Sequence, residues 1–134
     1  CPSAGWRRAR AAARASAAHG APLAAEAARL LPGAGGGTLD VAARDARAFF
    51  DDAGPLGWDV LVAAPPRAGL GALAARLAAD GPPRLVLVSC STSGLAADVS
   101  TLRAGGYALE ELVQVDMFPH TRHAESVALL TRVS

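Results

Sequence analysis

The sequence contains no lysine, asparagine or isoleucine, so all 13 of its basic side chains are arginine. Its two cysteines, Cys1 and Cys90, are not part of a CxxC pair, and the sequence therefore indicates neither a disulfide framework nor a structural zinc site. No stretch approaches the roughly 20 consecutive apolar residues that a membrane-spanning helix needs. A formal net charge of only +1 excludes a strongly basic, histone-like polymer.

The chain has 134 residues, 51% of them hydrophobic, which is enough apolar material for the core of one domain. Its first residue is Cys1 and its one methionine is Met117, which predicts a fragment or a processed product. Several arginines among the alanines of residues 7–14, without an acidic residue, leave a transit peptide as an alternative. The sequence does not settle the cellular compartment.

Helix-like and strand-like stretches alternate along the chain. Residues 6–19, 24–31 and 45–52 predict helices, and residues 38–42 predict a short strand. The second half gives a sharper pattern, with strands expected at Trp58–Ala63, Arg84–Ser89, Tyr107–Asp116 and Glu125–Arg132 and helices at Leu70–Ala79 and Gly94–Ala104. This order predicts a doubly wound α/β sheet with an antiparallel strand pair at its end.

Three segments surround the loops where such sheets bind ligands, beyond the carboxyl ends of the strands. They read APPRAGL over Ala64–Leu70, LVLVSCSTSGLAADVSTLRAGGY over Leu85–Tyr107, and VDMFPHTRHAESVALL over Val115–Leu130. In this order and spacing they resemble the C-terminal half of the S-adenosylmethionine-dependent RNA uracil-5-methyltransferases, which make 5-methyluridine in tRNA and ribosomal RNA. The resemblance is close over residues 58–134 and loose over residues 6–52.

The resemblance implies a fold, a reaction and a set of partners. The fold would be a Rossmann-like class I methyltransferase sheet, forming a partial catalytic domain over residues 1–134 that is truncated at its N-terminus. The cofactor would be S-adenosylmethionine and the substrate a uridine in tRNA or rRNA, with no metal and no membrane involved. The N-terminal part of the same polypeptide, with a Gly-rich donor-binding turn and an RNA-binding region, would be a missing partner.

The reaction that the resemblance implies requires a thiolate and a base. Uracil C5 is a poor nucleophile until a thiolate adds at C6 and makes the ring an enolate, and a base must later remove the C5 proton. The resemblance assigns these roles to Cys90 and Glu125. The placement of Cys90 supports its role, because it ends a buried strand just before a helix whose N-terminal dipole favours a thiolate. From placement alone, a small buried hydrophobic residue is the alternative.

Four further residues receive roles by the same resemblance. Arg67, Phe118 and His120 are expected to bind the RNA substrate, and Asp45 is expected to contact the adenine end of the methyl donor. Simpler alternatives stay open for three of them. Arg67 could be a solvated surface arginine, Phe118 could serve packing alone, and Asp45 could be a helix N-terminal residue.

The histidines allow a metal site as an alternative, because His120, His123 and Glu125 are close in sequence. An HxxH spacing places both side chains on one face only in a helix, whereas Pro119 and Thr121 favour a loop. The expectation is therefore that no metal binds here.

The sequence departs from the family pattern at two places near the expected site. Ala64 stands where the family carries an acid, and Ser91–Thr92 follows the nucleophile where the family has Asn-Pro. These departures raise the alternative of a non-catalytic remnant that keeps RNA or partner binding. A generic α/β interaction domain is a third interpretation. A sheet that lacks its first strand should also expose an edge or a hydrophobic groove.

Overall fold

The computed structural model describes residues 46–52, 57–117, 120 and 124–133, which belong to two units, residues 1–54 and 55–134. The first unit contributes helix α2, Ala46–Asp52, within the range predicted for it. Phe50 is only 5% exposed, and its ring meets that of Phe49 edge-to-face with centroids 5.9 Å apart. The other elements predicted before residue 45 lie outside the described residues.

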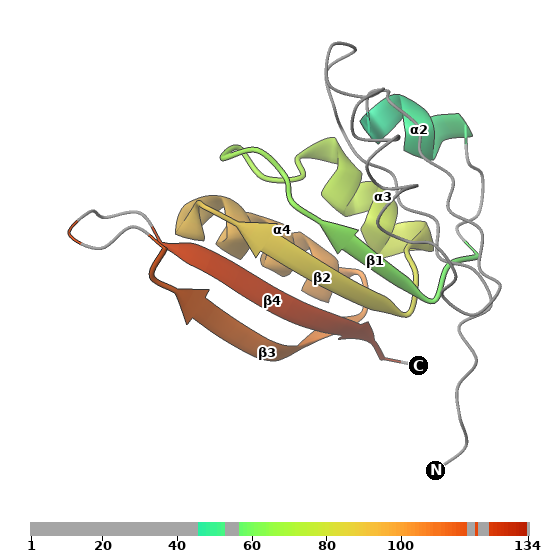
Figure 1. Ribbon diagram of the computed structural model, residues 1–134. Coiled ribbons are helices and arrows are strands. Elements are labelled where there is room, and N and C mark those ends of the chain that lie inside the picture. The colour runs from blue at the N-terminus through green and yellow to red at the C-terminus, as the bar shows by residue number, and fades with distance from the viewer. Residues whose placement is uncertain (1–45, 53–56, 118–119, 121–123, 134) are drawn as a thin grey trace, which may run out of the picture. The chain divides into compact units, whose positions relative to one another are not determined.

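The second unit contains a four-stranded mixed sheet in the order β1-β2-β4-β3 (Figure 1). Its strands are β1 Val60–Ala63, β2 Arg84–Ser89, β3 Tyr107–Val115 and β4 Glu125–Arg132. The β1 and β2 strands are parallel, whereas β4 runs antiparallel to both of its neighbours, β2 and β3. The predicted antiparallel pair at the end of the chain is confirmed.

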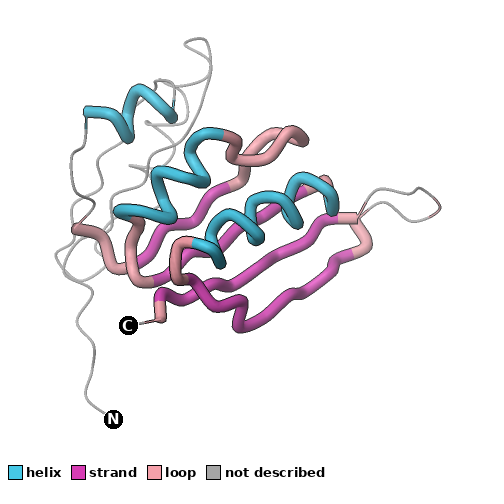
Figure 2. The backbone as a smooth tube through the Cα atoms, turned by 180° about the vertical axis from the view of Figure 1, so that it is seen from behind, coloured by secondary structure: helices cyan, strands magenta, loops and turns pink. Residues whose placement is uncertain are grey.

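Two helices, α3 Ala72–Asp80 and α4 Thr92–Ala104, cover one face of this sheet. They lie behind the strands in Figure 1 and in front of them in the reverse view of Figure 2. Alternate residues of β2 and β4 point to this face because side chains alternate along a strand. The register pairs Leu85 with Leu130 and Leu87 with Ala128, all four fully buried. Leu77 of α3 completes this core.

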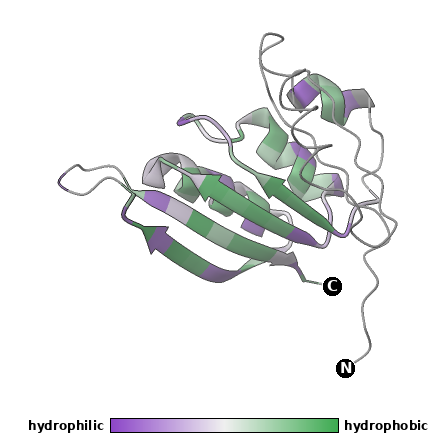
Figure 3. Ribbon diagram, viewed as in Figure 1, coloured by the Kyte–Doolittle hydropathy of each residue, from purple (hydrophilic) through white to green (hydrophobic). Residues whose placement is uncertain are grey.

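The opposite face also carries exposed apolar side chains, and Figure 3 shows that β1 and β2 consist mostly of hydrophobic residues. In the described part of this unit no helix lies on that face. Val62 of β1 is 63% exposed and Val113 of β3 is 43% exposed. The strand predicted over Trp58–Ala63 begins two residues later than expected, at Val60. The ladder begins only at the Val60–Arg84 pair, and β1 has a neighbouring strand on one side only among the described residues.

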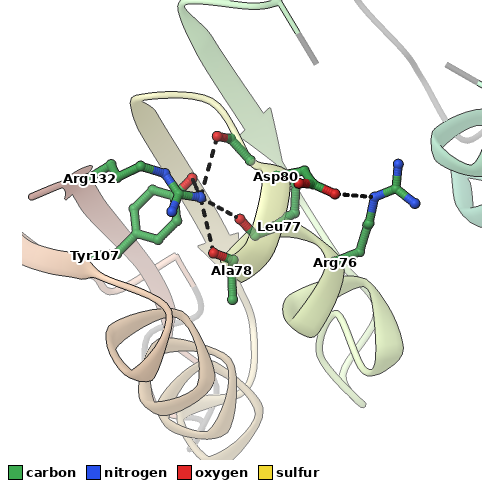
Figure 4. Close-up of polar contacts among 7 residues, drawn as sticks. Arg76, Leu77, Ala78, Asp80, Tyr107 and Arg132 are labelled. Atoms are coloured by element: carbon green, nitrogen blue, oxygen red, sulfur yellow. Dashed lines mark hydrogen bonds and ion pairs between the residues drawn. The ribbon is translucent and has the colours of Figure 1, made fainter. Parts of the chain in front are cut away.

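Arg132, the last residue of β4, contacts the ends of both helices, and Figure 4 shows its hydrogen bonds with α3. Its guanidinium donates to the carbonyls of Leu77 and Ala78 at 3.0 and 3.1 Å and to the carbonyl of Gly105 at 3.1 Å. These carbonyls belong to the C-terminal turns of α3 and α4, where helices leave acceptors unsatisfied and a cation is favourable. The hydrogen bonds of Arg132 therefore attach both helices to the end of the sheet.

Candidate functional site

Three segments of the second unit come together at one edge of the sheet (Figure 1). Because β1 and β2 are parallel, their carboxyl ends lead to Ala64 and Cys90 at the same edge. The antiparallel β4 begins at this edge, and its Ser126 pairs with Ser89 of β2. Cys90 follows Ser89 and Glu125 precedes Ser126, so both lie one residue beyond the same pair. The structure therefore places the backbones of Cys90 and Glu125 at adjacent positions beyond this pair.

Cys90 is a half-buried free cysteine in the turn between β2 and α4. The hydroxyl of Ser89 donates to the Ser91 carbonyl at 3.0 Å and accepts from the Ser91 amide at 3.2 Å. Ser89 itself is 2% exposed, so water competes little for these bonds. These two hydrogen bonds connect the residues before and after Cys90 and so fix the backbone on both sides of it.

Ser91 is the N-cap of α4, and its hydroxyl accepts a hydrogen bond from the Gly94 amide at 3.2 Å. The helix consequently begins at Thr92, two residues before the predicted start at Gly94, because serine satisfies an amide that the first helical turn leaves unpaired. Asparagine, the residue of the family pattern, is also a strong N-cap. This departure therefore preserves the local structure beside Cys90.

The loop after β1 lies against the first turn of α4. A hydrogen bond from the Gly69 amide to the Pro66 carbonyl, at 2.8 Å, closes a turn around Arg67. A side-chain carbon added at Gly94 would come within 2.8 Å of the Arg67 carbonyl, so the helix and the loop approach at backbone distance. The Arg67 side chain is exposed and makes no hydrogen bond or ion pair with the described part of the chain. It is available to an anionic ligand.

Asp98 of α4 is a buried carboxylate that the sequence analysis did not single out. It is 4% exposed, and its two oxygens accept from the Leu70 amide at 3.0 and 2.9 Å. Burial raises the pKa of Asp98, and hydrogen bonds from the amides of Leu70 and Gly71 oppose that shift. Its spacing from Leu95 and Leu102 was the available signal, because it places an acid on the buried face of the helix.

The remaining candidate residues divide between described and undescribed parts of the chain. Glu125 is half-buried and pairs with Val115 of β3. His120 is exposed and has a left-handed backbone, with φ of 67°. Asp45 and Phe118 lie outside the described residues, so their predicted contacts with the donor and the RNA remain predictions.

Among the residues that the structure describes, no three histidine, cysteine, aspartate or glutamate side chains are close enough to hold a metal ion. None of the described helices is long and apolar enough to cross a membrane. A cavity of about 650 Å³ lies between α4 and the β3–β4 pair, from Thr92 and Ser126 to Arg103. Neither Cys90 nor Glu125 is among its lining residues, but Thr92 and Ser126 place one end of the cavity beside them.

Residues 55–133 match the family model described as tRNA (uracil-5-)-methyltransferase. The 23S rRNA (uracil(747)-C(5))-methyltransferase of Pyrococcus abyssi is 40% identical over 95 residues, which are 71% of this chain and 23% of that protein. The 23S rRNA (uracil(1939)-C(5))-methyltransferase of Edwardsiella ictaluri is 45% identical over 73 residues, 54% of this chain and 17% of that protein. The chain thus spans about a fifth of the length of these relatives.

Solved structures show the same architecture. The crystal structure of Pyrococcus abyssi tRNA (uracil-54, C5)-methyltransferase in complex with S-adenosyl-L-homocysteine superimposes with a TM-score of 0.55 at 38% identity, covering 71% of this chain and 22% of that one. The precorrin-6y C5,15-methyltransferase of Geobacter metallireducens has a TM-score of 0.54 at 15% identity, covering 94% of this chain and 67% of that one. The sheet is therefore the Rossmann-like sheet of class I methyltransferases.

Proposed function

The chain belongs to the tRNA (uracil-5-)-methyltransferase family, and we propose that the polypeptide containing it methylates C5 of a uridine in tRNA or rRNA. The single observation that carries this proposal is the placement of Cys90 and Glu125, one residue beyond the Ser89–Ser126 pair at the ligand-binding edge of the sheet. A nucleophile and a base that face the same ring need such a placement.

Cys90 acts as the nucleophile in this proposal. Its thiolate adds to C6 of uracil, the C5–C6 double bond opens, and the electron pair makes C5 the enolate carbon. C5 then takes the methyl group. The Glu125 carboxylate removes the C5 proton, the electron pair restores the C5–C6 double bond, and the thiolate leaves from C6. The hydrogen bonds between Ser89 and Ser91 keep Cys90 in place through addition and elimination.

Arg67 and His120 are exposed on loops at this edge, where they are accessible to RNA. The Arg67 guanidinium would stabilise negative charge on the uracil enolate or hold a phosphate. Phe118 would shape the pocket for the base. These three assignments, and the adenine contact of Asp45, rest on the family motifs.

S-adenosylmethionine would supply the methyl group as a sulfonium, whose sulfur–methyl bond would break as the bond to C5 forms, leaving a neutral thioether. Of the described residues expected to face this donor, Ala64 offers only a methyl side chain and cannot accept a hydrogen bond from it. At the end of β1, the side chain of Ala64 would therefore contribute no hydrogen bond to the donor. The addition, proton removal and elimination described above are therefore assigned only to residues that are expected to face the uracil.

A second candidate function follows from Ala64, which stands exposed where the family carries an acid. In that case the polypeptide would be a non-catalytic remnant that binds RNA without methylating it. The Ala64→Asp variant separates the two functions, because it restores only the acid. Activity that appears in this variant and is absent from the wild type would favour the remnant.

The decisive experiment is trapping with RNA that contains 5-fluorouridine. Fluorine at C5 cannot leave as a proton, so a methylated covalent adduct should accumulate when the donor is present. The complete natural polypeptide and the isolated chain are incubated side by side, and the products are analysed by denaturing gel and intact mass. The chain offers a matched control, because Cys1 is its only other cysteine.

The expected result is an adduct in the complete polypeptide that survives Cys1→Ala and disappears in Cys90→Ala and Cys90→Ser. An adduct in both Cys90 variants would contradict the assigned nucleophile. No adduct in the wild type, together with RNA binding that Cys90→Ala leaves unchanged, would favour the remnant instead.

A further inference from the structure

We infer that Asp98 is a positioning residue, which fixes the Ala64–Leu70 loop on helix α4 and so sets where Arg67 lies relative to Cys90. This inference rests on the proposed function, because it requires Arg67 and Cys90 to act on the same uridine. Asp98 itself lies on the buried face of α4 and touches neither the RNA nor the donor in this account.

The hydrogen bonds between Asp98 and the described residues come from the loop. Both carboxylate oxygens accept from the Leu70 amide, at 3.0 and 2.9 Å. A side-chain carbon added at Gly69 would come within 2.8 Å of one of these oxygens, so the loop backbone packs directly on the carboxylate. Gly69 also has φ of 81°, a conformation that side chains rarely adopt. The loop is therefore held by the Asp98 carboxylate in addition to its own hydrogen bond from Gly69 to Pro66.

The same helix carries the other half of the site. Ser91, the N-cap of α4, follows Cys90 directly, and a side-chain carbon added at Gly94 of the first turn would come within 2.8 Å of the Arg67 carbonyl oxygen. Asp98 lies one further turn along α4. Helix α4 thus connects the two parts of the site. The turn that carries Cys90 lies at its start, and the loop that carries Arg67 is bound to its side.

The free-energy cost of burying the Asp98 carboxylate indicates that this side chain has a specific role. Buried acids are uncommon in proteins unless their oxygens are well paired, because desolvation disfavours the charged form. A leucine at this position would extend the buried face formed by Leu95 and Leu102. It would leave the Leu70 amide without this acceptor and the loop without its attachment.

The test is a double-mutant cycle between Asp98 and Arg67, measured as the single-turnover rate of adduct formation with 5-fluorouridine RNA. Asp98→Asn keeps the side-chain shape but replaces one acceptor oxygen with a donor amide. We expect it to slow adduct formation by about tenfold to 100-fold, since a misplacement of about 1 Å can cost about 100-fold. In an Arg67→Ala background the same substitution should cost less than about twofold, since coupled residues are not additive.

Leu102→Ala is the matched control, because Leu102 is fully buried on the same face of α4 but lies away from the loop. It should lower thermal stability at least as much as Asp98→Asn while leaving the Arg67-dependent rate unchanged. Should Asp98→Asn fail to fold, Asp98→Glu enters the same cycle. Its carboxylate is retained, but the extra methylene displaces the loop.

Equal rate losses from Asp98→Asn in both backgrounds would overturn the inference, because Asp98 would then act on the fold as a whole. So would a wild-type rate in Asp98→Asn. In either case an adduct in the wild type leaves the proposed function standing. The absence of any wild-type adduct would overturn the proposed function, and the positioning role with it.

Discussion

The guanidinium carbon of Arg132 lies 4.4 Å from the centre of the Tyr107 ring, and the Tyr107 hydroxyl donates to the Pro82 carbonyl at 2.6 Å. Arg132 also donates to this hydroxyl at 3.2 Å. The two residues are paired across β3 and β4, at the end of the sheet opposite the candidate site. Their contacts determine whether α3 and α4 keep their positions on the sheet.

Arg132→Lys should lower the free energy of unfolding by about 2–3 kcal/mol, since a lysine cannot reproduce the forked hydrogen bonds of arginine and leaves partly buried carbonyls without this donor. The carbonyls of Ala78 and Gly105 lose it, whereas the Leu77 carbonyl still accepts from the Gly81 amide at 2.8 Å. Urea denaturation of the chain measures the change. Arg84→Lys, at an exposed position, is the control and should be nearly neutral. Equal effects of the two substitutions would refute the assigned role of Arg132.

Tyr107→Phe should cost about 1 kcal/mol at neutral pH, because the Pro82 carbonyl loses its donor. Burial raises the pKa of Tyr107 above 10.0, with the Arg132 contact acting in the opposite direction. The stability that the protonated phenol contributes is therefore complete below pH 10 and is lost as the pH rises through the folded-state pKa. The stability difference between wild type and Tyr107→Phe should accordingly shrink in that alkaline range.

The measurement is chemical denaturation at a series of pH values, with the phenolate absorbance followed in parallel. Because the chain has one tyrosine, this absorbance reports on Tyr107 alone. A phenol that titrates at its ordinary pKa in the folded chain would contradict the prediction.

Gly105→Ala should destabilise the chain by about 1–3 kcal/mol through overpacking between the helices. A carbon added at Gly105 would come within 2.8 Å of the Ala78 Cα and 2.9 Å of its carbonyl oxygen. The backbone itself is not the cause, because Gly105 has φ of −91°, which alanine adopts readily. Gly57→Ala, where nothing lies within 4 Å, is the matched control for thermal unfolding. A similar melting temperature in both variants would count against this tight contact.

The sequence predicts the strands well, because their hydrophobic residues and flanking turns are local signals. The bounds of β2 and β4 are those expected, Arg84–Ser89 and Glu125–Arg132. The start of α4 was placed two residues late, since a hydrogen bond from Gly94 to the Ser91 side chain is not visible in hydropathy. Helix caps depend on single polar atoms, and a pattern of apolar residues does not contain them.

The candidate site was predictable only in part for the same physical reason. The motifs locate Cys90 and Glu125, and the sheet register places them together. Asp98 was missed because its partner, the Leu70 amide, is a backbone group 28 residues away in the sequence. A backbone donor has no residue type, so no motif reveals it.

Glu125→Gln should stall the proposed reaction after methyl transfer, since glutamine cannot accept the C5 proton and the thiolate cannot then leave. Turnover should fall about 100-fold or more, the usual contribution of a general base. A methylated adduct should accumulate on ordinary uridine RNA, detected by intact mass in the complete polypeptide. Glu111→Gln, an exposed acid on β3, is the control and should turn over as the wild type does. Unchanged turnover in Glu125→Gln would mean that another residue is the general base. Loss of turnover without an adduct would mean that Glu125 acts before the thiolate adds.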